Sequence, residues 1–157
     1  MNYNSILTAV TFALLLCSCG PEIIYSHKVN IEGPWDYSEK INFEFEIADT
    51  IPAYDIVLNT THSKDFAFQN VYTKMTTIFP DSNSTNHLVS LDLTDKLNQW
   101  TGNCSGKECM VPILLSQHIF FKKPGKYTIT AEQYGRKDDL EGVLSLELVI
   151  SKAEVKK

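Results

Sequence analysis

The segment from Ile41 to Ile47 constrains the fold of this chain more than any other stretch. Every second residue in it is apolar, and the positions between are filled by Asn42, Glu44 and Glu46. Successive side chains of a β-strand point to opposite faces, so this period of two predicts a strand with one buried and one solvated face. Such a strand belongs to an antiparallel sheet whose apolar face is covered by a second layer.

Similar strand patterns recur along the chain, separated by turn-forming residues such as Pro80–Ser84 and Lys122–Gly125. No segment has the 3.6-residue period of a long helix. The predicted strands cover residues 23–31, 41–47, 54–60, 70–78, 87–93, 110–121, 127–133 and 143–150. About eight such strands predict an all-β fold, an antiparallel β-sandwich in which two sheets bury each other's apolar faces; a small β-barrel is the alternative.

Three local features give more specific expectations. Trp35 follows the break at Gly33-Pro34 and is predicted to close one end of the core. The polar segment 94–102 is predicted to form one helical turn or an irregular crossover. The final strand is predicted to place four apolar side chains on one face: Leu144, Leu146, Leu148 and Ile150.

The N-terminus carries an apolar run from Ile6 that ends at Leu16-Cys17-Ser18-Cys19. Its length fits the ~7–15 residues of a signal-peptide core and falls short of the ~20 needed to span a bilayer. A small residue before Cys19 and a leucine three positions upstream are typical of a bacterial lipobox. We therefore predict cleavage after Ser18 and acylation of Cys19 with chains such as palmitate. Met1–Ser5 carries no Lys or Arg, and a buried strand with two structural cysteines is the alternative.

Removal of the predicted signal peptide, residues 1–18, leaves 139 of the 157 residues, the size of one domain. We expect a lipidated N-terminus, tether and first strand in 19–33, a β-sandwich domain in 34–151 and a solvated tail in 152–157. The first 18 residues contain no charged side chain, so the mature chain keeps the formal net charge of −5. That charge argues against nucleic acid as a partner, because phosphate binding requires a basic surface.

Two cysteines, Cys104 and Cys109, remain in the mature chain besides the predicted lipidation site. An even pair in an exported, oxidising compartment predicts a structural disulfide. It would close a short loop that contains Gly106. A zinc site needs more ligands than this pair supplies, and a redox site more usually has the Cys-x-x-Cys spacing, so these are the weaker alternatives.

The chain carries no recognised catalytic or cofactor-binding motif: no Gly-x-Ser-x-Gly, His-Glu-x-x-His, P-loop or Gly-x-Gly-x-x-Gly. The pairs Asp92/Asp95 and Asp138/Asp139 lie beside turn residues, which favours solvated loop ends over acid–base or calcium sites. The four histidines are scattered, which favours packing or surface roles: His27, His62, His87 and His118. We predict no enzyme activity, no cofactor and no metal; a hydrolase whose groups meet only in space is the least favoured alternative.

A set of motifs runs through the whole mature chain. After the lipobox come Trp35 and a Phe43–Asp49 strand that ends in Asp. Further on are Phe66-x-Phe68-x-Asn70, Asp95-x-x-x-x-Trp100-x-Gly102, Gly125-x-Tyr127-x-Ile129-x-x-Glu132-Gln133-x-x-Arg136 and Leu140-x-Gly142-Val143. In order and spacing these motifs resemble the gliding-motility lipoprotein GldH family, with Glu132-Gln133…Arg136…Gly142 as the most specific part.

The resemblance implies an envelope lipoprotein needed, with sister lipoproteins, for surface gliding and the associated protein secretion machinery, and it implies no enzyme activity. It also indicates candidate structural or contact positions: Asp49, Asn70, Trp100, Gly102, Gln133 and Arg136. Arg136 is the only arginine in the chain and lies at the tip of the last hairpin. A bidentate partner contact and an exposed turn residue are both open readings for it.

We therefore predict a non-enzymatic, membrane-anchored envelope lipoprotein. Its expected partners are the membrane, through lipid on Cys19, and other envelope lipoproteins or secretion and motility proteins. Gly20 stands where an Asp often marks retention in the inner membrane, which favours the outer membrane. The alternative function is an anchored sandwich that binds glycan or another small ligand on an aromatic platform, for which the candidates are Tyr25, Tyr37 and Tyr72.

Overall fold

The computed structural model describes residues 20–135 and 137–154, so the predicted signal peptide, Cys19 and Arg136 lie outside the described residues. Eleven strands form within this part of the chain, and it contains no helix long and apolar enough to cross a bilayer. The strands are β1 Ile23–Asn30, β2 Trp35–Asp36, β3 Lys40–Ile47, β4 Tyr54–Ser63, β5 Asn70–Ile78, β6 Ser84–Asp92, β7 Asn103–Ser105, β8 Glu108–Ile119, β9 Gly125–Gln133, β10 Asp139–Leu140 and β11 Val143–Lys152.

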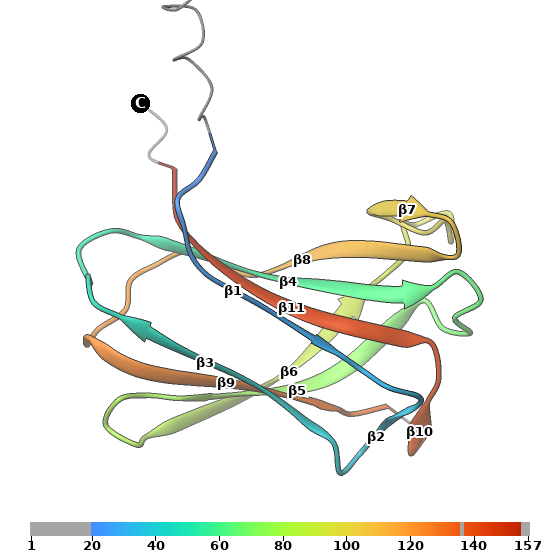
Figure 1. The fold of residues 1–157 in the computed structure, drawn as a ribbon, viewed down its shortest axis with the longest axis horizontal. Helices are drawn as coiled ribbons and strands as arrows, with labels where there is room; N and C mark the ends of the chain where they lie inside the picture. Colours follow the sequence, from blue (N-terminus) through green and yellow to red (C-terminus); the bar gives the residue numbers. More distant parts are fainter. Residues whose placement is uncertain (1–19, 136, 155–157) are drawn as a thin grey trace, which may run out of the picture.

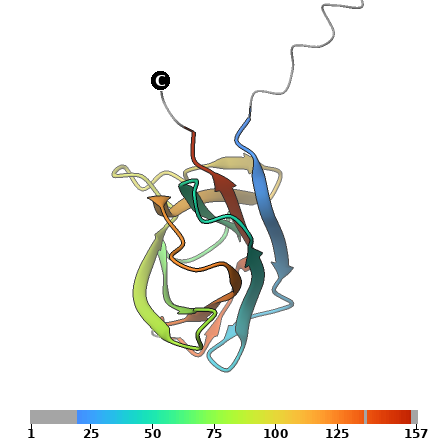
Figure 2. The same cartoon turned by 90° about the vertical axis from the view of Figure 1, so that its left-hand side faces the viewer.

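Two large antiparallel sheets face each other (Figures 1 and 2). One has the strand order β1-β11-β4-β8-β7 and the other β3-β9-β5-β6, while β10 and β2 form a small separate pair. The predicted all-β sandwich is therefore confirmed. Because both large sheets keep free edges, they do not close into the small β-barrel that was the alternative prediction.

The core lies between the two large sheets and follows the predicted alternation. In β3 every second residue is buried, and β4 alternates in the same way through all of its ten residues. Trp35 is fully buried, and its indole Nε1 donates a hydrogen bond to the Glu39 carbonyl at 3.0 Å. It pairs with Leu140 across the small sheet, and both side chains belong to the buried core.

The last strand differs from the prediction at one position. Leu146, Leu148 and Ile150 are fully buried as expected, but Leu144 is only partly buried. A register shift against β4 between Val143 and Ser145 is the physical reason, because a bulge places an extra residue in the strand and changes which side chains face inward.

Three other segments refine the sequence prediction. β6 begins at Ser84 rather than at His87, because residues 84–86 continue the pairing with the end of β5. Residues 94–102 form the irregular crossover, closed by a bridge between Thr94 and Trp100. The strands β2, β7 and β10 were not predicted, since segments of two or three residues are too short to show a period.

The Cys104–Cys109 disulfide is present, as predicted. The two cysteines are cross-strand partners in the β7–β8 hairpin, and Cys109 is fully buried. The bond therefore fixes a tight loop at the edge of the five-stranded sheet.

Candidate functional site

An apolar cleft of about 620 Å³ opens between the two sheets on the side bordered by the edge strand β6 and by β8, which is flanked only by the short β7. On the opposite side β1 and β3 lie next to each other (Figure 2). Tyr25 of β1 packs there on Phe45 of β3 with ring centroids 5.4 Å apart. β7 pairs only with Glu108–Met110, so the rest of β8 has a free outer edge. The cleft is the part of the interior that no further strand covers.

The floor of the cleft comes from the inward faces of strands in both sheets. It includes Phe45 of β3, Ile56 of β4, Met75 of β5 and Ile129 of β9. Leu115 and Ile119 of β8 form the opposite wall and are partly buried. Almost every group on this floor is hydrocarbon or aromatic, so the cleft is suited to an apolar ligand.

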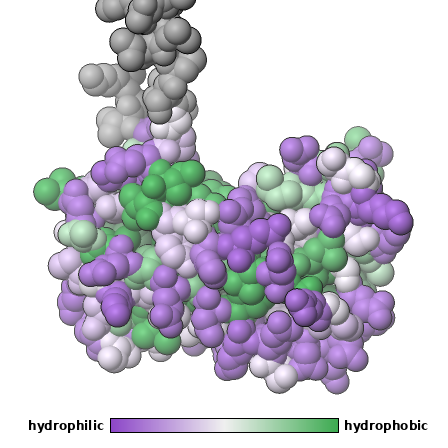
Figure 3. Space-filling view, viewed as in Figure 1, coloured by the Kyte–Doolittle hydropathy of each residue, from purple (hydrophilic) through white to green (hydrophobic). Residues whose placement is uncertain are grey.

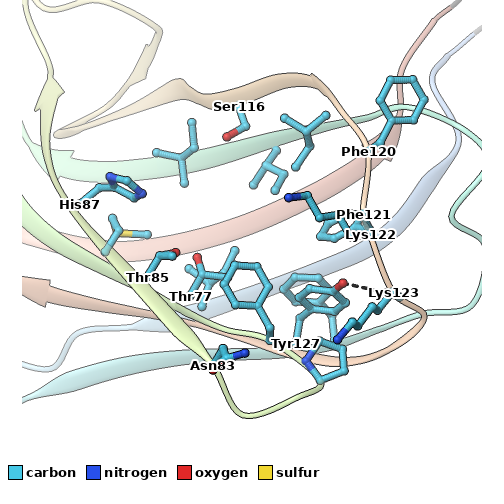
Figure 4. A pocket seen from close by; sticks show the side chains of 18 of the residues that line it. Thr77, Asn83, Thr85, His87, Ser116, Phe120, Phe121, Lys122, Lys123 and Tyr127 are labelled. Carbon is cyan, nitrogen blue, oxygen red and sulfur yellow. Dashed lines mark hydrogen bonds between the residues drawn. The ribbon is translucent and has the colours of Figure 1, made fainter.

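Aromatic contacts hold the β8–β9 loop over one end of the cleft. Phe121 packs edge-on against Tyr127 at 4.9 Å and against Tyr54 at 5.3 Å. The Tyr127 hydroxyl donates a hydrogen bond to the Lys123 carbonyl at 2.7 Å. These contacts place Lys122 and Lys123 at the rim of the cleft (Figure 4).

The two lysines at the rim have different surroundings. Lys123 Nζ lies 2.8 Å from Asp81 Oδ2 in the β5–β6 turn, and this hydrogen bond is the main cause that lowers the pKa of Asp81. Among the residues that the structure describes, no carboxylate lies within 4.0 Å of Lys122 Nζ. Figure 4 shows Lys122 reaching into the cleft from the loop. One uncompensated positive charge therefore stands at this end of an apolar cleft.

A polar strip lines the other wall. Thr77 of β5 and Thr85 and His87 of β6 border the cleft (Figure 4). Thr85 and His87 are exposed although they lie on the strand face that borders the cleft, because β6 is the edge strand of its sheet. The cleft thus has an apolar floor, one polar wall and one cationic end.

Two of the positions taken from the family resemblance make local hydrogen bonds at strand ends. Asp49 Oδ1 accepts from the Ile51 backbone N–H at 2.9 Å, and the Asp49 carbonyl accepts from the Tyr54 hydroxyl at 2.7 Å. Asn70 begins β5, and its Nδ2 donates to Ser90 Oγ at 2.7 Å. Each of these contacts fixes a turn or a strand end.

Trp100 and Gly102 lie together beside the β7–β8 hairpin. The Trp100 ring lies 4.5 Å from the imidazole of His62, and its Nε1 donates to the Lys64 carbonyl at 3.2 Å. Gly102 has a φ of +77°, and a Cβ there would lie 2.2 Å from the Met110 carbonyl oxygen. Only glycine fits this close approach of two backbone segments.

Gln133 organises the loop that follows β9. Its side chain is 3% exposed, and its Nε2 donates to the carbonyls of Lys137 and Asp138 at 2.7 and 3.0 Å. Its Oε1 accepts from the Gly135 N–H at 2.9 Å. Arg136, within this loop, lies outside the described residues. None of the five described positions lines the apolar cleft.

The predicted aromatic platform does not form one surface. Tyr25 belongs to the five-stranded sheet and packs on Phe45, whereas Tyr72 is exposed on β5 of the other sheet. The Tyr37 hydroxyl donates to the Gly135 carbonyl at 2.5 Å. Within residues 20–135 and 137–154 no group of three or more His, Cys, Asp or Glu side chains could hold a metal ion.

His62 is the one fully buried histidine among the described residues, and we expect it to make stability depend on pH. Its Nδ1 lies 2.8 Å from the Ser63 carbonyl, while its Nε2 has no partner in the described structure. Burial lowers the pKa of His62 below its usual value, so the unfolded chain binds more protons between that lowered pKa and about 6.5. Stability is complete above about pH 6.5 and falls as the pH drops through this window.

A His62→Phe variant tests this expectation because it cannot titrate. Urea unfolding of the parent between about pH 5 and 7 should show a positive slope of stability with pH, and the variant should show a flatter one. The pKa of Glu147 is also lowered, mainly by a hydrogen bond from Asn59, so its protonation changes stability at a lower pH than that of His62. Both proteins keep Glu147, and the stability change in that lower window serves as an internal reference. Equal slopes for the two proteins between about pH 5 and 7 would contradict the assignment.

Sequence reasoning missed the residues of the cleft. A signal was present in β8, where the neighbours Leu114 and Leu115 are both apolar and break simple alternation. A second signal was Phe120-Phe121 directly before Lys122-Lys123, which joins apolar and cationic groups in one loop. Neither pattern reveals that the two sheets leave a space here, because that depends on which strands become edges.

Comparison with known proteins gives the family. The family model of the GldH lipoprotein matches residues 23–150. The chain belongs to the GldH lipoprotein family. The resemblance predicted from the sequence motifs is therefore confirmed, and this GldH-family chain is related to gliding-motility lipoproteins.

Two individual proteins are similar to this GldH-family chain. A gliding motility lipoprotein GldH homolog from Christiangramia forsetii is 24% identical over 144 residues, which cover 91% of this chain and 88% of that protein. A solved structure of the uncharacterized protein lmo2446 from Listeria monocytogenes, in complex with glucose, magnesium and calcium, has 13% identity and a TM-score of 0.33. That likeness covers 84% of this chain but only 11% of the Listeria chain, and at this TM-score it carries no weight for the fold or the ligand.

Proposed function

We propose that this protein is a non-enzymatic component of the cell envelope, anchored through lipid on Cys19, that works with other proteins of the gliding-motility and associated secretion machinery. The observation that carries the proposal is the family match over residues 23–150, which begins four residues after Cys19. The lipobox pattern supports the anchor. Gly20 at the following position supports the outer membrane as its location.

The geometry of the sandwich supports one end as the membrane-facing end. The described chain enters β1 and leaves β11 at the same end, where Ile23 pairs with Ser151 and Lys152 Nζ lies 2.8 Å from Glu22 Oε2 (Figure 1). Apolar surface gathers at the base of the tether over the start of β1 (Figure 3), and Ile23 is 59% exposed. Exposed apolar groups beside a lipid anchor fit an interfacial position.

The opposite end of the sandwich supports protein docking. It carries the crossover that contains Trp100, the disulfide hairpin and the loop organised by Gln133. His62, near the end of β4, pairs with both Cys109 and Val143, so these segments lie at the end of the sheet away from the tether. Loops held on a rigid scaffold are common positions for binding. Leu97 in the crossover is 79% exposed and presents an apolar side chain at this end.

Photo-crosslinking in intact cells tests the docking proposal. A photoreactive amino acid at Leu97 should yield discrete adducts with other envelope proteins after irradiation, identified by mass spectrometry. The same amino acid at Ile51, which is 86% exposed in the turn before β4 near the tether, is the matched control and should not yield these adducts. Identical protein adducts from both positions, or none from Leu97, would overturn this docking surface.

A further inference from the structure

We propose that the cleft between β6 and β8 binds the acyl chain of an anionic membrane lipid, with the lipid head group at Lys122. The cleft of about 620 Å³ falls within the range of small-molecule sites, ~300–1,000 Å³. Its floor of Ile56, Met75 and Ile129 offers continuous apolar contact. An acyl chain would lie on this floor and cover the partly buried side chains of Leu115 and Ile119, which would then contact hydrocarbon rather than water.

Charge complementarity indicates the chemistry of the head group. Lys123 is paired with Asp81, whereas Lys122 has no carboxylate partner among the described residues and reaches into the cleft (Figure 4). An apolar cleft with one unpaired cation at its end matches an amphiphile with an apolar tail and an anionic head. The ammonium would gain a charge-assisted hydrogen bond from a phosphate or carboxylate oxygen at this position.

The position of the cationic end indicates a membrane source for the ligand. Ile119 at the end of β8 pairs with Tyr54, and Tyr54 pairs with Lys152 of β11, so Lys122 lies at the end of the sandwich where the tether enters. This choice of source rests on the proposed anchor at Cys19. An extended peptide could pair with the free edges of β6 and β8, but the unpaired Lys122 over an apolar floor favours the lipid.

Lipid photo-crosslinking in cells tests the inference on the native protein. Cells that carry the gene are grown with a photoactivatable long-chain fatty acid that enters their lipids, irradiated, and the protein is purified and digested. Adducts of phospholipid mass are expected on peptides from β8 and β5, which line the cleft. Acylation of the peptide that begins at residue 19 reports the anchor separately, so a failure of the anchor and a failure of the cleft are distinguishable.

Two pairs of variants locate the site. Lys122→Glu reverses the charge at the cleft, whereas Lys126→Glu reverses an exposed charge that does not line it. Lys122→Glu should reduce the cleft adducts about fivefold, as expected for the loss of one charge pair, and Lys126→Glu should leave them within about twofold. Leu115→Glu should abolish them, while Leu114→Glu, at a neighbouring position that is 53% exposed and outside the cleft, should not.

Phospholipid adducts on the cleft peptides that are reduced in Lys122→Glu but not in Lys126→Glu support the inference, and the exposed Lys122→Glu variant keeps the test valid if Leu115→Glu fails to fold. Adducts confined to the tether peptide, adducts of unesterified fatty acid only, or equal labelling in Lys122→Glu and its control would overturn it. Crosslinks from the cleft to another polypeptide would instead assign the cleft to a peptide.

Discussion

A Gly102→Ala substitution is expected to lower the free energy of unfolding by about 3 kcal/mol or more. At this position φ is +77°, and a Cβ would lie 2.2 Å from the Met110 carbonyl oxygen and 2.9 Å from the Val111 Cα. Both obstacles are backbone atoms of β8, which is paired with β4, so they cannot rotate away as a side chain would. The substitution must therefore displace the crossover that carries Trp100.

Gly106→Ala is the matched control for this prediction. Gly106 also has a positive φ, +57°, but a Cβ there meets nothing within 4 Å. Its substitution should cost only the left-handed backbone penalty, about 1–2 kcal/mol. Urea unfolding of both variants with unchanged m-values measures the difference. Equal losses of stability would show that the approach of Gly102 to β8 does not govern this region.

A Cys19→Ala substitution is expected to lower the membrane-bound fraction of the protein about tenfold or more. Two or more acyl chains give stable anchoring, whereas the exposed apolar groups near the tether and a single lipid chain in the cleft would give only marginal, reversible binding. Those groups include Ile23 and Ile51, which are side chains of single residues and far smaller than acyl chains. Fractionation of cells followed by immunoblotting measures the shift to the soluble fraction.

Cys17→Ala separates the lipid from a general effect of losing a cysteine. Cys17 lies two residues before Cys19, within the segment that the proposal removes as a signal peptide. This variant should remain in the membrane fraction like the parent. Retention of Cys19→Ala in the membrane, or release of Cys17→Ala, would count against anchoring through Cys19.

Most of the fold could be predicted because its strands keep a strict local period. The Ile41–Ile47 pattern predicted β3 to within one residue, and β5 has the predicted bounds of 70–78. Local patterns could not predict the bulge near Leu144, because a register shift depends on the neighbouring strand β4. The pairing of Trp35 with Leu140 was equally hidden, since the two residues come from distant parts of the chain.

The candidate site was less predictable than the fold. The positions Trp100, Gly102 and Gln133, taken from the family resemblance, lie outside the cleft, and their contacts there are local packing and hydrogen bonds. The apolar cleft could not be predicted, because it exists only where β6 and β8 become free edges of facing sheets. Lys122 gains its significance only from this long-range arrangement.

The mass of the mature protein extracted from membranes tests the central proposal, a β-sandwich anchored through lipid on Cys19, most directly. We expect a chain that begins at Cys19 and carries the additional mass of a diacylglyceryl group, with the acyl chains located on the N-terminal peptide. An unmodified chain that still begins at Met1 would contradict the proposal.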